Sequence, residues 1–497
     1  MRQPREQLEQ ADQLRQLGQL DRAESICHAL TQRHPDFVAA LHTLGLVYLD
    51  KRNFERALDC LVRAQMLDPN NWMILTALSL AYLRLGANEM AAQTLDRALA
   101  IRPDDASTYA SLGEIYREER EYELAQYAYR KALTLDSGLE SAAIGLALCH
   151  LALGQNSEAA RVLEDAFRRG NRSLNLLDVM ATLPRNTLSI DLLAALDVLS
   201  VSQREQDAEF KNTFAFVRAA ALHIADRYGE AWKLLEAANR PLFAEHKSQL
   251  KEDNARQEKS LARLRSVSFK PVGTSKAPVS LFILGASRSG KSSLEHLLGA
   301  LDGVKTGCEV PIVENALRRA FQSAAFPASQ NLEDLPPELL PSFRDYYLED
   351  LTRRAGSTKV FTNTLSQRIH DASIIASVIP NVRFVFLRRD LQDTALRIYM
   401  TKYLRGNSYA YDLKSIAGYL QWYNHMIDLA AEKFSEIALL VTYESMIADP
   451  LTGLRKIATM CGLSIKDGPI PALVDDRGVA THYREFMGDY EILREQI

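Results

Sequence analysis

Small and apolar residues recur along the first third of the chain with a period of 34 residues. A small residue returns at one position of the period and alanine returns at another, with apolar residues at helical spacing between them. Antiparallel helices need small residues where their backbones cross closely. The pattern therefore predicts stacked helix pairs, in five copies from about Pro4 to Arg169. The two positions hold Ala11, Gly45, Ser79, Gly113 and Ala147, and Ala23, Ala57, Ala91, Ala125 and Ala159.

The repeat weakens after Arg169, although apolar residues keep helical spacing as far as about residue 210. A further helix pair is predicted over 214–235, and the segment ANRPL (238–242) is predicted to end it. Residues 246–265 are rich in charge and glutamine, which indicates a solvated connecting helix.

Residues 268–280 contain two prolines, one glycine and four serines or threonines. This composition is typical of a linker. We therefore predict a helical repeat domain over 1–267, a linker over 268–280 and a second domain over 281–497.

The second domain lacks the 34-residue period of the first; short apolar runs alternate there with segments of helical spacing. Such alternation predicts parallel β-α-β units, with a ligand at the carboxyl edge of the sheet. The stretch 303–310 is expected to return toward this sheet. Strands are predicted at 281–284, 359–363, 382–387 and 437–443.

A glycine-bounded loop follows the first of these strands. Gly285, Gly290, Lys291 and Ser292 satisfy the spacing G-x-x-x-x-G-K-[ST], and a helical pattern begins after the loop. The spacing lets backbone N–H groups and a helix N-terminus converge on a phosphate, while Lys291 and Arg288 add positive charge. We therefore predict an anionic, phosphorylated ligand here. The alternative is a surface turn with chance glycines.

Composition narrows the classes of function. A net charge of −4, spread over 59 basic and 63 acidic residues, argues against a dedicated nucleic-acid or membrane-surface binder. The five cysteines are far apart and lack metal-ligand spacing, so we expect buried thiols in a reducing compartment and no metal site. No apolar run is long enough to span a bilayer and the first residues lack an apolar signal region, so a cytoplasmic location is expected.

Four motifs, in this order, resemble the sulfotransferase superfamily: GASRSGKSS (285–293), CEVPIVENAL (308–317), FVFLRRDLQDTALRIYM (384–400) and VTYESMIADPLTGLRKIATMCGL (441–463). They look most like the tyrosylprotein branch, whose bacterial relatives often carry tetratricopeptide repeats, the repeat type that the helix pairs resemble. The resemblance implies a P-loop-type three-layer α/β sandwich. It also implies transfer of a sulfuryl group from 3′-phosphoadenosine-5′-phosphosulfate to a hydroxyl without a metal.

The resemblance also assigns roles to residues. Glu309 stands where the family has its general base, Arg288 near the bridging and sulfuryl oxygens, and Arg389 where an arginine holds the 3′-phosphate. Without the family, Glu309 could be a capping or surface residue and Arg389 could form a surface salt bridge. The implied donor-binding residues are Ser287, Arg288, Ser289, Gly290, Lys291, Ser292, Ser293, Arg389 and Arg397.

The chain departs from the family at the residues that would stabilise the transferred group. Thr364 stands where the family has a lysine, and Arg397 where it has a serine that contacts the 3′-phosphate. Losing one positioned donor commonly costs about 10²- to 10³-fold in rate. Lys291 is a candidate substitute for the missing cation, and we count it with Glu309 and Arg288 as catalytic candidates.

Three functions remain open from the sequence. The first is a sulfotransferase acting on a protein tyrosine, a glycan or a small molecule, with repeats that bind the substrate or a partner protein. The second is an ATP- or GTP-dependent phosphotransferase or NTPase, in which Ser292 would bind Mg²⁺ and an acid such as Asp390 would support it. The third is an inactive transferase fold that serves as a scaffold.

Overall fold

The structure is a computed structural model in which the chain forms two compact units, Met1–Ala195 and Leu196–Ile497. Each unit is described by itself. The structure describes residues 2–85, 87–202, 208–267, 272–273, 275–324, 329, 331–403, 406–464, 470–471, 473 and 475–487.

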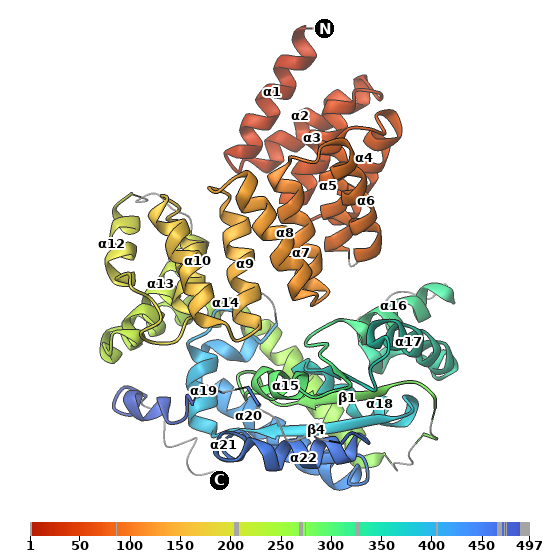
Figure 1. The fold of residues 1–497 in the computed structure, drawn as a ribbon, viewed down its shortest axis with the longest axis vertical. Helices are drawn as coiled ribbons and strands as arrows, with labels where there is room; N and C mark the ends of the chain where they lie inside the picture. Colours follow the sequence, from red (N-terminus) through yellow and green to blue (C-terminus); the bar gives the residue numbers. More distant parts are fainter. Residues whose placement is uncertain are drawn as a thin grey trace. The chain divides into compact units, whose positions relative to one another are not determined.

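Helices α1 to α10 of the first unit pack as consecutive pairs, α1 with α2 through α9 with α10 (Figure 1). A short helix α11 follows, in the stretch where the repeat weakens. The bounds are α1 (Arg2–Gln16), α2 (Leu20–Arg33), α3 (Val38–Asp50), α4 (Phe54–Leu67), α5 (Trp72–Arg84), α6 (Asn88–Ile101), α7 (Ala106–Glu118), α8 (Tyr122–Leu135), α9 (Glu140–Ala152), α10 (Asn156–Arg168) and α11 (Leu174–Ala181).

The small residues of the 34-residue period lie where helices meet. The five alanines from Ala23 to Ala159 are all fully buried. A Cβ on Gly45 would lie 2.6 Å from Leu61 Cγ, and a Cβ on Gly113 would lie 2.8 Å from the ring of Tyr129. Larger side chains would push these helices apart, so the repeat architecture is confirmed, with its physical cause.

The predicted end of the further helix pair is wrong. Helix α13 (Ala208–Ile224) is followed by α14 (Tyr228–Ser266), which runs for 39 residues through Pro241. Proline removes one helical hydrogen bond, but α14 is held on both sides of it. Asn239 Nδ2 donates to Tyr399 O at 3.0 Å, and Gln257 O accepts from Trp422 Nε1 at 3.0 Å.

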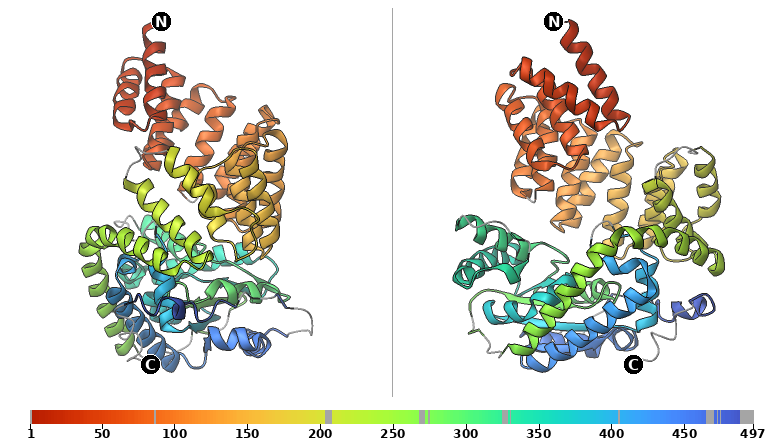
Figure 2. Two further views of the ribbon diagram at one scale, coloured as in Figure 1. Left: turned by 90° about the vertical axis from the view of Figure 1, so that its left-hand side faces the viewer. Right: turned by 180° about the vertical axis from the view of Figure 1, so that it is seen from behind.

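Residues 246–265 are helical, as predicted, and most of them are exposed, but one face of α14 is packed. Gln257, Ser260 and Leu264 are buried. Figure 2 shows α14 as a continuous helix that crosses the α/β part of the second unit beside α20 (Leu413–Lys433). The division between the compact units, within α12 (Leu192–Ser202), therefore does not coincide with the 268–280 boundary drawn from the sequence. Residues 268–271 and 274 of the predicted linker lie outside the described residues.

Five strands of the second unit form a sheet in the order β2-β3-β1-β4-β5, and every neighbouring pair is parallel; Figure 1 labels β1 and β4. The four predicted strands are present within one or two residues at their ends, and the short β2 lies in the stretch expected to return to the sheet. The bounds are β1 (Val279–Leu284), β2 (Val304–Lys305), β3 (Val360–Asn363), β4 (Val382–Arg388) and β5 (Ala438–Thr442).

Helices cover both faces of the sheet because the side chains of β1 alternate between two cores. Leu281 and Ile283 share one apolar cluster with Leu294 and Ile457. On the other face Ser280 bonds to Tyr347. The helices are α15 (Lys291–Gly299), α16 (Ile312–Ser323), α17 (Leu340–Ala355), α18 (Ala372–Val378), α19 (Leu391–Tyr399), α21 (Tyr443–Ala448) and α22 (Pro450–Met460), with α20 as above.

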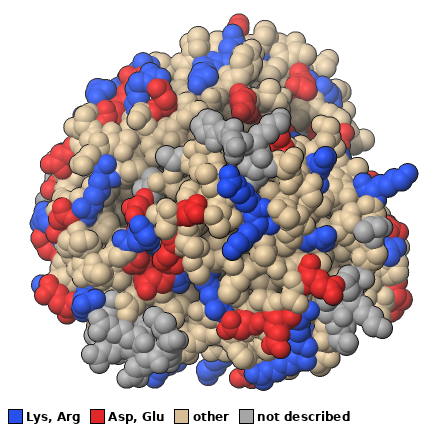
Figure 3. All heavy atoms as spheres, turned by 60° about the horizontal axis from the view of Figure 1, so that its bottom comes forward, with Lys and Arg blue, Asp and Glu red and all other residues tan. Residues whose placement is uncertain are grey.

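The surface carries both signs of charge. On the face shown in Figure 3, acidic and basic side chains of the described residues are interspersed. Within the described part of the chain, no helix combines the length and the apolar character needed to cross a membrane. The five cysteines are free thiols, and Cys27, Cys149 and Cys461 are buried.

Candidate functional site

The loop after β1 is shaped by two glycines. A Cβ on Gly285 would lie 2.7 Å from Leu387 O on the neighbouring strand, and a Cβ on Gly290 would lie 2.4 Å from Tyr443 Cδ2. Gly290 and Arg288 both have positive φ angles, 95° and 65°. The loop turns sharply as a result, and α15 begins at Lys291 with its first N–H groups directed back toward the loop.

Lys291 is buried beneath this loop. Its side chain is 7% exposed, and Nζ donates to Ala286 O at 2.9 Å. Burial lowers the pKa of Lys291 to about 8, an effect that Glu309 opposes and Arg288 reinforces. Arg288 itself is exposed. The loop therefore holds a desolvated ammonium group that an incoming anion would stabilise.

Glu309 is carried by a turn that is fixed from below. The Cys308 N–H donates to Glu295 Oε1 at 2.8 Å, and the Gly307 N–H donates to Thr362 Oγ1 at 3.0 Å. The Thr362 hydroxyl also donates to the same Glu295 oxygen. Glu295 and Thr362 are buried, at 2% and 0% exposure, whereas Glu309 is exposed. This buried network holds the turn while leaving the Glu309 carboxylate open.

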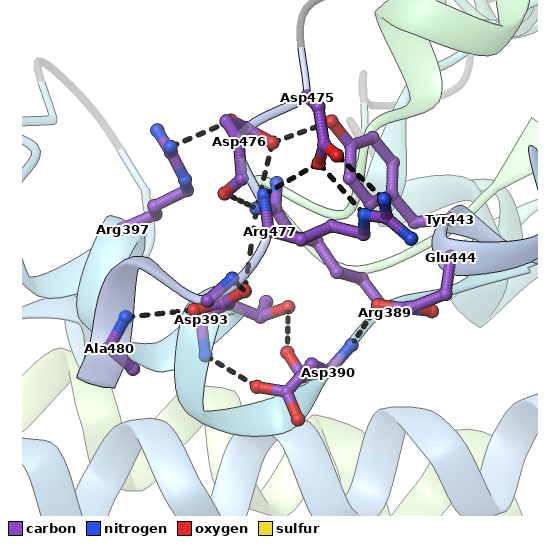
Figure 4. A network of polar contacts seen from close by, with 12 residues as sticks. Arg389, Asp390, Asp393, Arg397, Tyr443, Glu444, Asp475, Asp476, Arg477 and Ala480 are labelled. Atoms are coloured by element: carbon purple, nitrogen blue, oxygen red, sulfur yellow. Dashed lines mark hydrogen bonds and ion pairs between the residues drawn. The ribbon is translucent and has the colours of Figure 1, made fainter. Parts of the chain in front are cut away.

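A second group of cations lies after β4 (Figure 4). Arg389 follows the strand and Arg397 lies on α19. Asp476 accepts from both: Arg389 Nη2 at 2.9 Å and Arg397 Nη2 at 2.7 Å. The Tyr443 hydroxyl donates to Asp476 Oδ1 at 2.5 Å, and the Arg389 guanidinium lies 4.3 Å from the centre of the Tyr443 ring. Burial lowers the pKa of Arg397 and raises that of Tyr443.

All but one of the predicted site residues line a single cavity of about 410 Å³. We call the part formed by residues 287–293 the loop end and the part formed by Arg389, Arg397, Tyr443 and Asp476 the arginine end. The exception is Ser289, whose buried hydroxyl lies outside the lining and has no hydrogen-bond partner among the described residues. The lining residues are Ser287, Arg288, Gly290, Lys291, Ser292, Ser293, Glu309, Ser366, Arg389, Arg397, Tyr403, Tyr443 and Asp476.

Thr364 does not line the cavity. It is 2% exposed, and its N–H donates to Cys308 O at 2.7 Å. Asp390, the acid considered as a support for Mg²⁺, instead caps the N-terminus of α19. Its Oδ1 accepts from the Asp393 N–H at 2.8 Å, and it is not part of the lining.

Four lining residues are not among the predicted site residues: Ser366, Tyr403, Tyr443 and Asp476. Ser366 and Tyr443 follow the carboxyl ends of β3 and β5, so the rule that ligands lie at this edge could have pointed to them. Tyr403, which donates to or accepts from Ser287 Oγ at 2.9 Å, belongs to a tyrosine-rich stretch visible in the sequence. Asp476 lies in a segment without periodicity, and no pattern marks it.

Comparison with known families separates the two parts of the chain. Residues 278–467 match the model described as the sulfotransferase family. Residues 8–59, 42–106 and 106–138 match models of the tetratricopeptide repeat. The chain therefore has tetratricopeptide repeats toward its N-terminus and a sulfotransferase-family domain toward its C-terminus.

Curated relatives match parts of the chain. An uncharacterised Aquifex aeolicus protein is 23% identical over 216 residues, 42% of this chain and 28% of that protein. A BBSome complex member BBS4 homolog of Drosophila melanogaster is 28% identical, covering 26% of each chain. The type IV pilus assembly protein PilF of Pseudomonas aeruginosa is 43% identical over 60 residues, 12% of this chain and 24% of that protein. The chain spans about a quarter of the length of these relatives.

Solved structures are similar over about a third of the chain. MamA is 25% identical with a TM-score of 0.28, covering 32% of this chain and 93% of that one. TTC0263, a tetratricopeptide-repeat protein of Thermus thermophilus, is 23% identical with a TM-score of 0.33, covering 35% of this chain and 94% of that one.

Proposed function

We propose that this chain, which joins tetratricopeptide repeats to a sulfotransferase-family domain, transfers the sulfuryl group of 3′-phosphoadenosine-5′-phosphosulfate to a hydroxyl of a protein tyrosine or a glycan. The observation that carries the proposal is the shared cavity. It gathers one open carboxylate, Glu309, and two separate groups of cations. A donor with one anionic group at its 5′ side and another at its 3′ side needs this arrangement.

Glu309 is the proposed general base. Its carboxylate would take the proton of the acceptor hydroxyl as that oxygen bonds to sulfur. The bond between sulfur and the 5′-phosphate oxygen breaks, and its electron pair leaves with the 3′,5′-bisphosphate. The Glu295–Thr362 network supports this role, because it holds the turn without occupying the Glu309 carboxylate.

Lys291 and Arg288 are the proposed stabilisers of the charge that develops during transfer. With a pKa of about 8, Lys291 is protonated at neutral pH in the free protein, and an anion beside it favours the charged form further. Thr364 is buried outside the cavity and contributes no cation. Lys291 therefore takes the place of the lysine expected at position 364.

The arginine end is the proposed site of the 3′-phosphate. Arg389 Nε and Arg397 Nε are buried and have no hydrogen-bond acceptor among the described residues. The donors of the two guanidinium groups are therefore not all used within the protein. A cavity of about 410 Å³ is within the usual range for a small-molecule site, roughly 300–1,000 Å³.

The repeats are the proposed binding surface for a protein substrate or partner, as such stacked helices generally offer extended surfaces. A cytoplasmic setting is part of the proposal, since free cysteines persist in a reducing compartment.

A nucleotide-dependent phosphotransferase or NTPase is the second candidate. The G-x-x-x-x-G-K-S spacing, with Lys291 inside the loop, favours it. The use of Asp390 as a helix cap weighs against it. An inactive scaffold is the third candidate, and the absent cation at position 364 is its only support.

Two measurements decide among the three. The first is the shift of the unfolding temperature with adenosine 3′,5′-bisphosphate in EDTA, and with ATP with and without Mg²⁺. The second is release of the bisphosphate from the sulfate donor in the presence of tyrosine peptides or a disaccharide. We expect stabilisation by the bisphosphate in EDTA and release that Glu309→Gln slows about 10²-fold or more. Stabilisation by ATP only with Mg²⁺ would favour the phosphotransferase, and no stabilisation the scaffold.

A further inference from the structure

The arginine end of the cavity already contains an anion, the carboxylate of Asp476. Both of its oxygens are engaged: Oδ1 accepts from Arg389 Nη2 at 2.9 Å and from the Tyr443 hydroxyl at 2.5 Å, and Oδ2 accepts from Arg397 Nη2 at 2.7 Å (Figure 4). Two guanidinium groups and a hydroxyl that converge on one carboxylate are the donors that bind a phosphate monoester.

The three donors come from a rigid frame. Arg389 follows β4 directly and its side chain is 3% exposed. Tyr443 begins α21, is 2% exposed, and its ring lies against Gly290 of the loop and beneath the Arg389 guanidinium. Arg397 lies on α19. The donors are therefore in place whichever anion they bind.

The segment that carries Asp476 is held to the same frame. Asp393, which is 3% exposed, accepts from the Gly478 N–H at 2.6 Å and from the Ala480 N–H at 2.8 Å. The neighbouring Asp475 does not line the cavity and pairs with Arg477, whose Nε and Nη2 donate to its carboxylate oxygens at 2.8 and 2.6 Å. Only Asp476 of the two acids is directed at the arginines.

We propose that the Asp476 carboxylate is an internal competitor for the donor's 3′-phosphate and thereby sets how tightly the protein binds a nucleotide with a second phosphate. The inference rests on the proposed function, because it takes the arginine end to be the 3′-phosphate site. Asp393 Oδ2 also lies 3.8 Å from Arg389 Nη2, but of the described acids only Asp476 forms ion pairs with both arginines. A phosphate that replaced the Asp476 carboxylate would accept from the donors that this carboxylate now holds.

The carboxylate and the phosphate cannot share the site. A second anion held at the same three donors would face Asp476 at contact distance, and like charges that close repel strongly in a site with little water. Binding of the 3′-phosphate therefore requires the Asp476 carboxylate to leave the arginines. The free energy needed to displace it makes the free energy of nucleotide binding less favourable. A nucleotide without a 3′-phosphate makes no such exchange.

The test compares two nucleotides on four proteins by isothermal titration calorimetry. The nucleotides are adenosine 3′,5′-bisphosphate and adenosine 5′-monophosphate; the proteins are the wild type, Asp476→Asn, Asp476→Glu and Asp475→Asn. We expect Asp476→Asn to bind the bisphosphate at least tenfold more tightly and to change the Kd of the monophosphate less than threefold. Asp476→Glu keeps the competing charge and should remain close to the wild type. Asp475→Asn removes the same charge from the adjacent position and should leave both affinities within about twofold.

Two results would overturn the inference alone: an unchanged Kd for the bisphosphate in Asp476→Asn, or an equal gain for both nucleotides, which would indicate a general effect of charge. Absence of bisphosphate binding in every folded protein would overturn the proposed donor as well. If Asp476→Asn does not fold, Asp476→Ser replaces it, since a hydroxyl still accepts hydrogen bonds from the arginines without the negative charge.

Discussion

At the loop end of the cavity, Arg288 and Lys291 have no carboxylate within ion-pair distance among the described residues, whereas at the arginine end Arg389 and Arg397 share Asp476. At the loop end the charged form of Lys291 is destabilised, because burial is not balanced by an ion pair and lowers its pKa to about 8. At the arginine end the Asp476 carboxylate offsets part of the desolvation of the two arginines, although burial still lowers the pKa of Arg397. An external anion should therefore gain most at the loop end, where the chemistry is proposed, and meet competition at the arginine end.

Removal of the loop-end ammonium should have the largest effect. We expect Lys291→Ala to lower the rate of sulfuryl transfer about 10²- to 10³-fold, because no cation replaces it at position 364. Release of the 3′,5′-bisphosphate at saturating donor measures the rate. Lys276→Ala, at an exposed lysine outside the cavity lining, is the matched control. A rate within threefold of the wild type would rule out the substitution of Lys291 for the missing lysine.

Removal of an arginine-end cation should act on affinity and less on rate. We expect Arg389→Gln to weaken binding of the 3′,5′-bisphosphate about 30-fold, which corresponds to a lost charged hydrogen bond of about 2 kcal/mol, while the 5′-monophosphate is little affected. Titration calorimetry measures both. The control is Arg388→Gln, since Arg388 Nη2 donates to Asn424 O at 2.9 Å and does not line the cavity. An equal loss for both nucleotides would place the 3′-phosphate elsewhere.

The two ends should also differ in their response to pH. Above about pH 8 Lys291 loses its proton in the free protein, so an anion at the loop end must bind together with a proton. The affinity for the 5′-monophosphate should therefore be flat below pH 8 and fall up to about tenfold per pH unit above it. Calorimetry at pH 7, 8 and 9 measures this slope. Arginine stays charged over this pH range, so Lys291→Arg should abolish the fall in affinity above pH 8. A fall that persists in this variant would assign the proton to another group.

The smallest expected effect is on stability, and its sign should differ between the ends. Lys291→Met removes a desolvated charge and should raise the free energy of unfolding by about 1 kcal/mol. Asp476→Asn removes the ion pair with Arg397 and one of the two ion pairs of Arg389, and should lower the free energy of unfolding by about 2 kcal/mol. Urea unfolding without nucleotide measures both. A loss of stability in Lys291→Met would mean that the ammonium stabilises the empty loop.

The repeats could be predicted from the sequence because each contact between helices recurs 34 residues later, so Gly45 and Gly113 carry the same information. The strands could be predicted because a buried parallel sheet needs continuous apolar runs. The path of α14 could not: Pro241 is a local signal to stop, and the contacts of Asn239 and Gln257 that override it join residues far apart in the chain.

In the site, too, residues that lie in local sequence motifs could be predicted, whereas contacts between residues far apart in the chain could not. Glu309 and Arg389 could be predicted because each lies in a motif with a fixed place in the fold, and both line the cavity. Their chemical roles stay predictions. Asp476 lies beyond residues 278–467, which match the family, and reaches Arg389 across 87 positions of the chain. No local pattern records such a contact.

Helix α14 has a practical consequence for anyone who wishes to work with the α/β portion in isolation. A fragment starting near residue 268, where the linker was drawn, would strip away the helix against which Trp422 and Tyr399 are bonded, and would uncover the apolar surface beneath Leu264. The second compact unit begins at Leu196, so we expect a stable fragment to start there, about seventy residues upstream of residue 268.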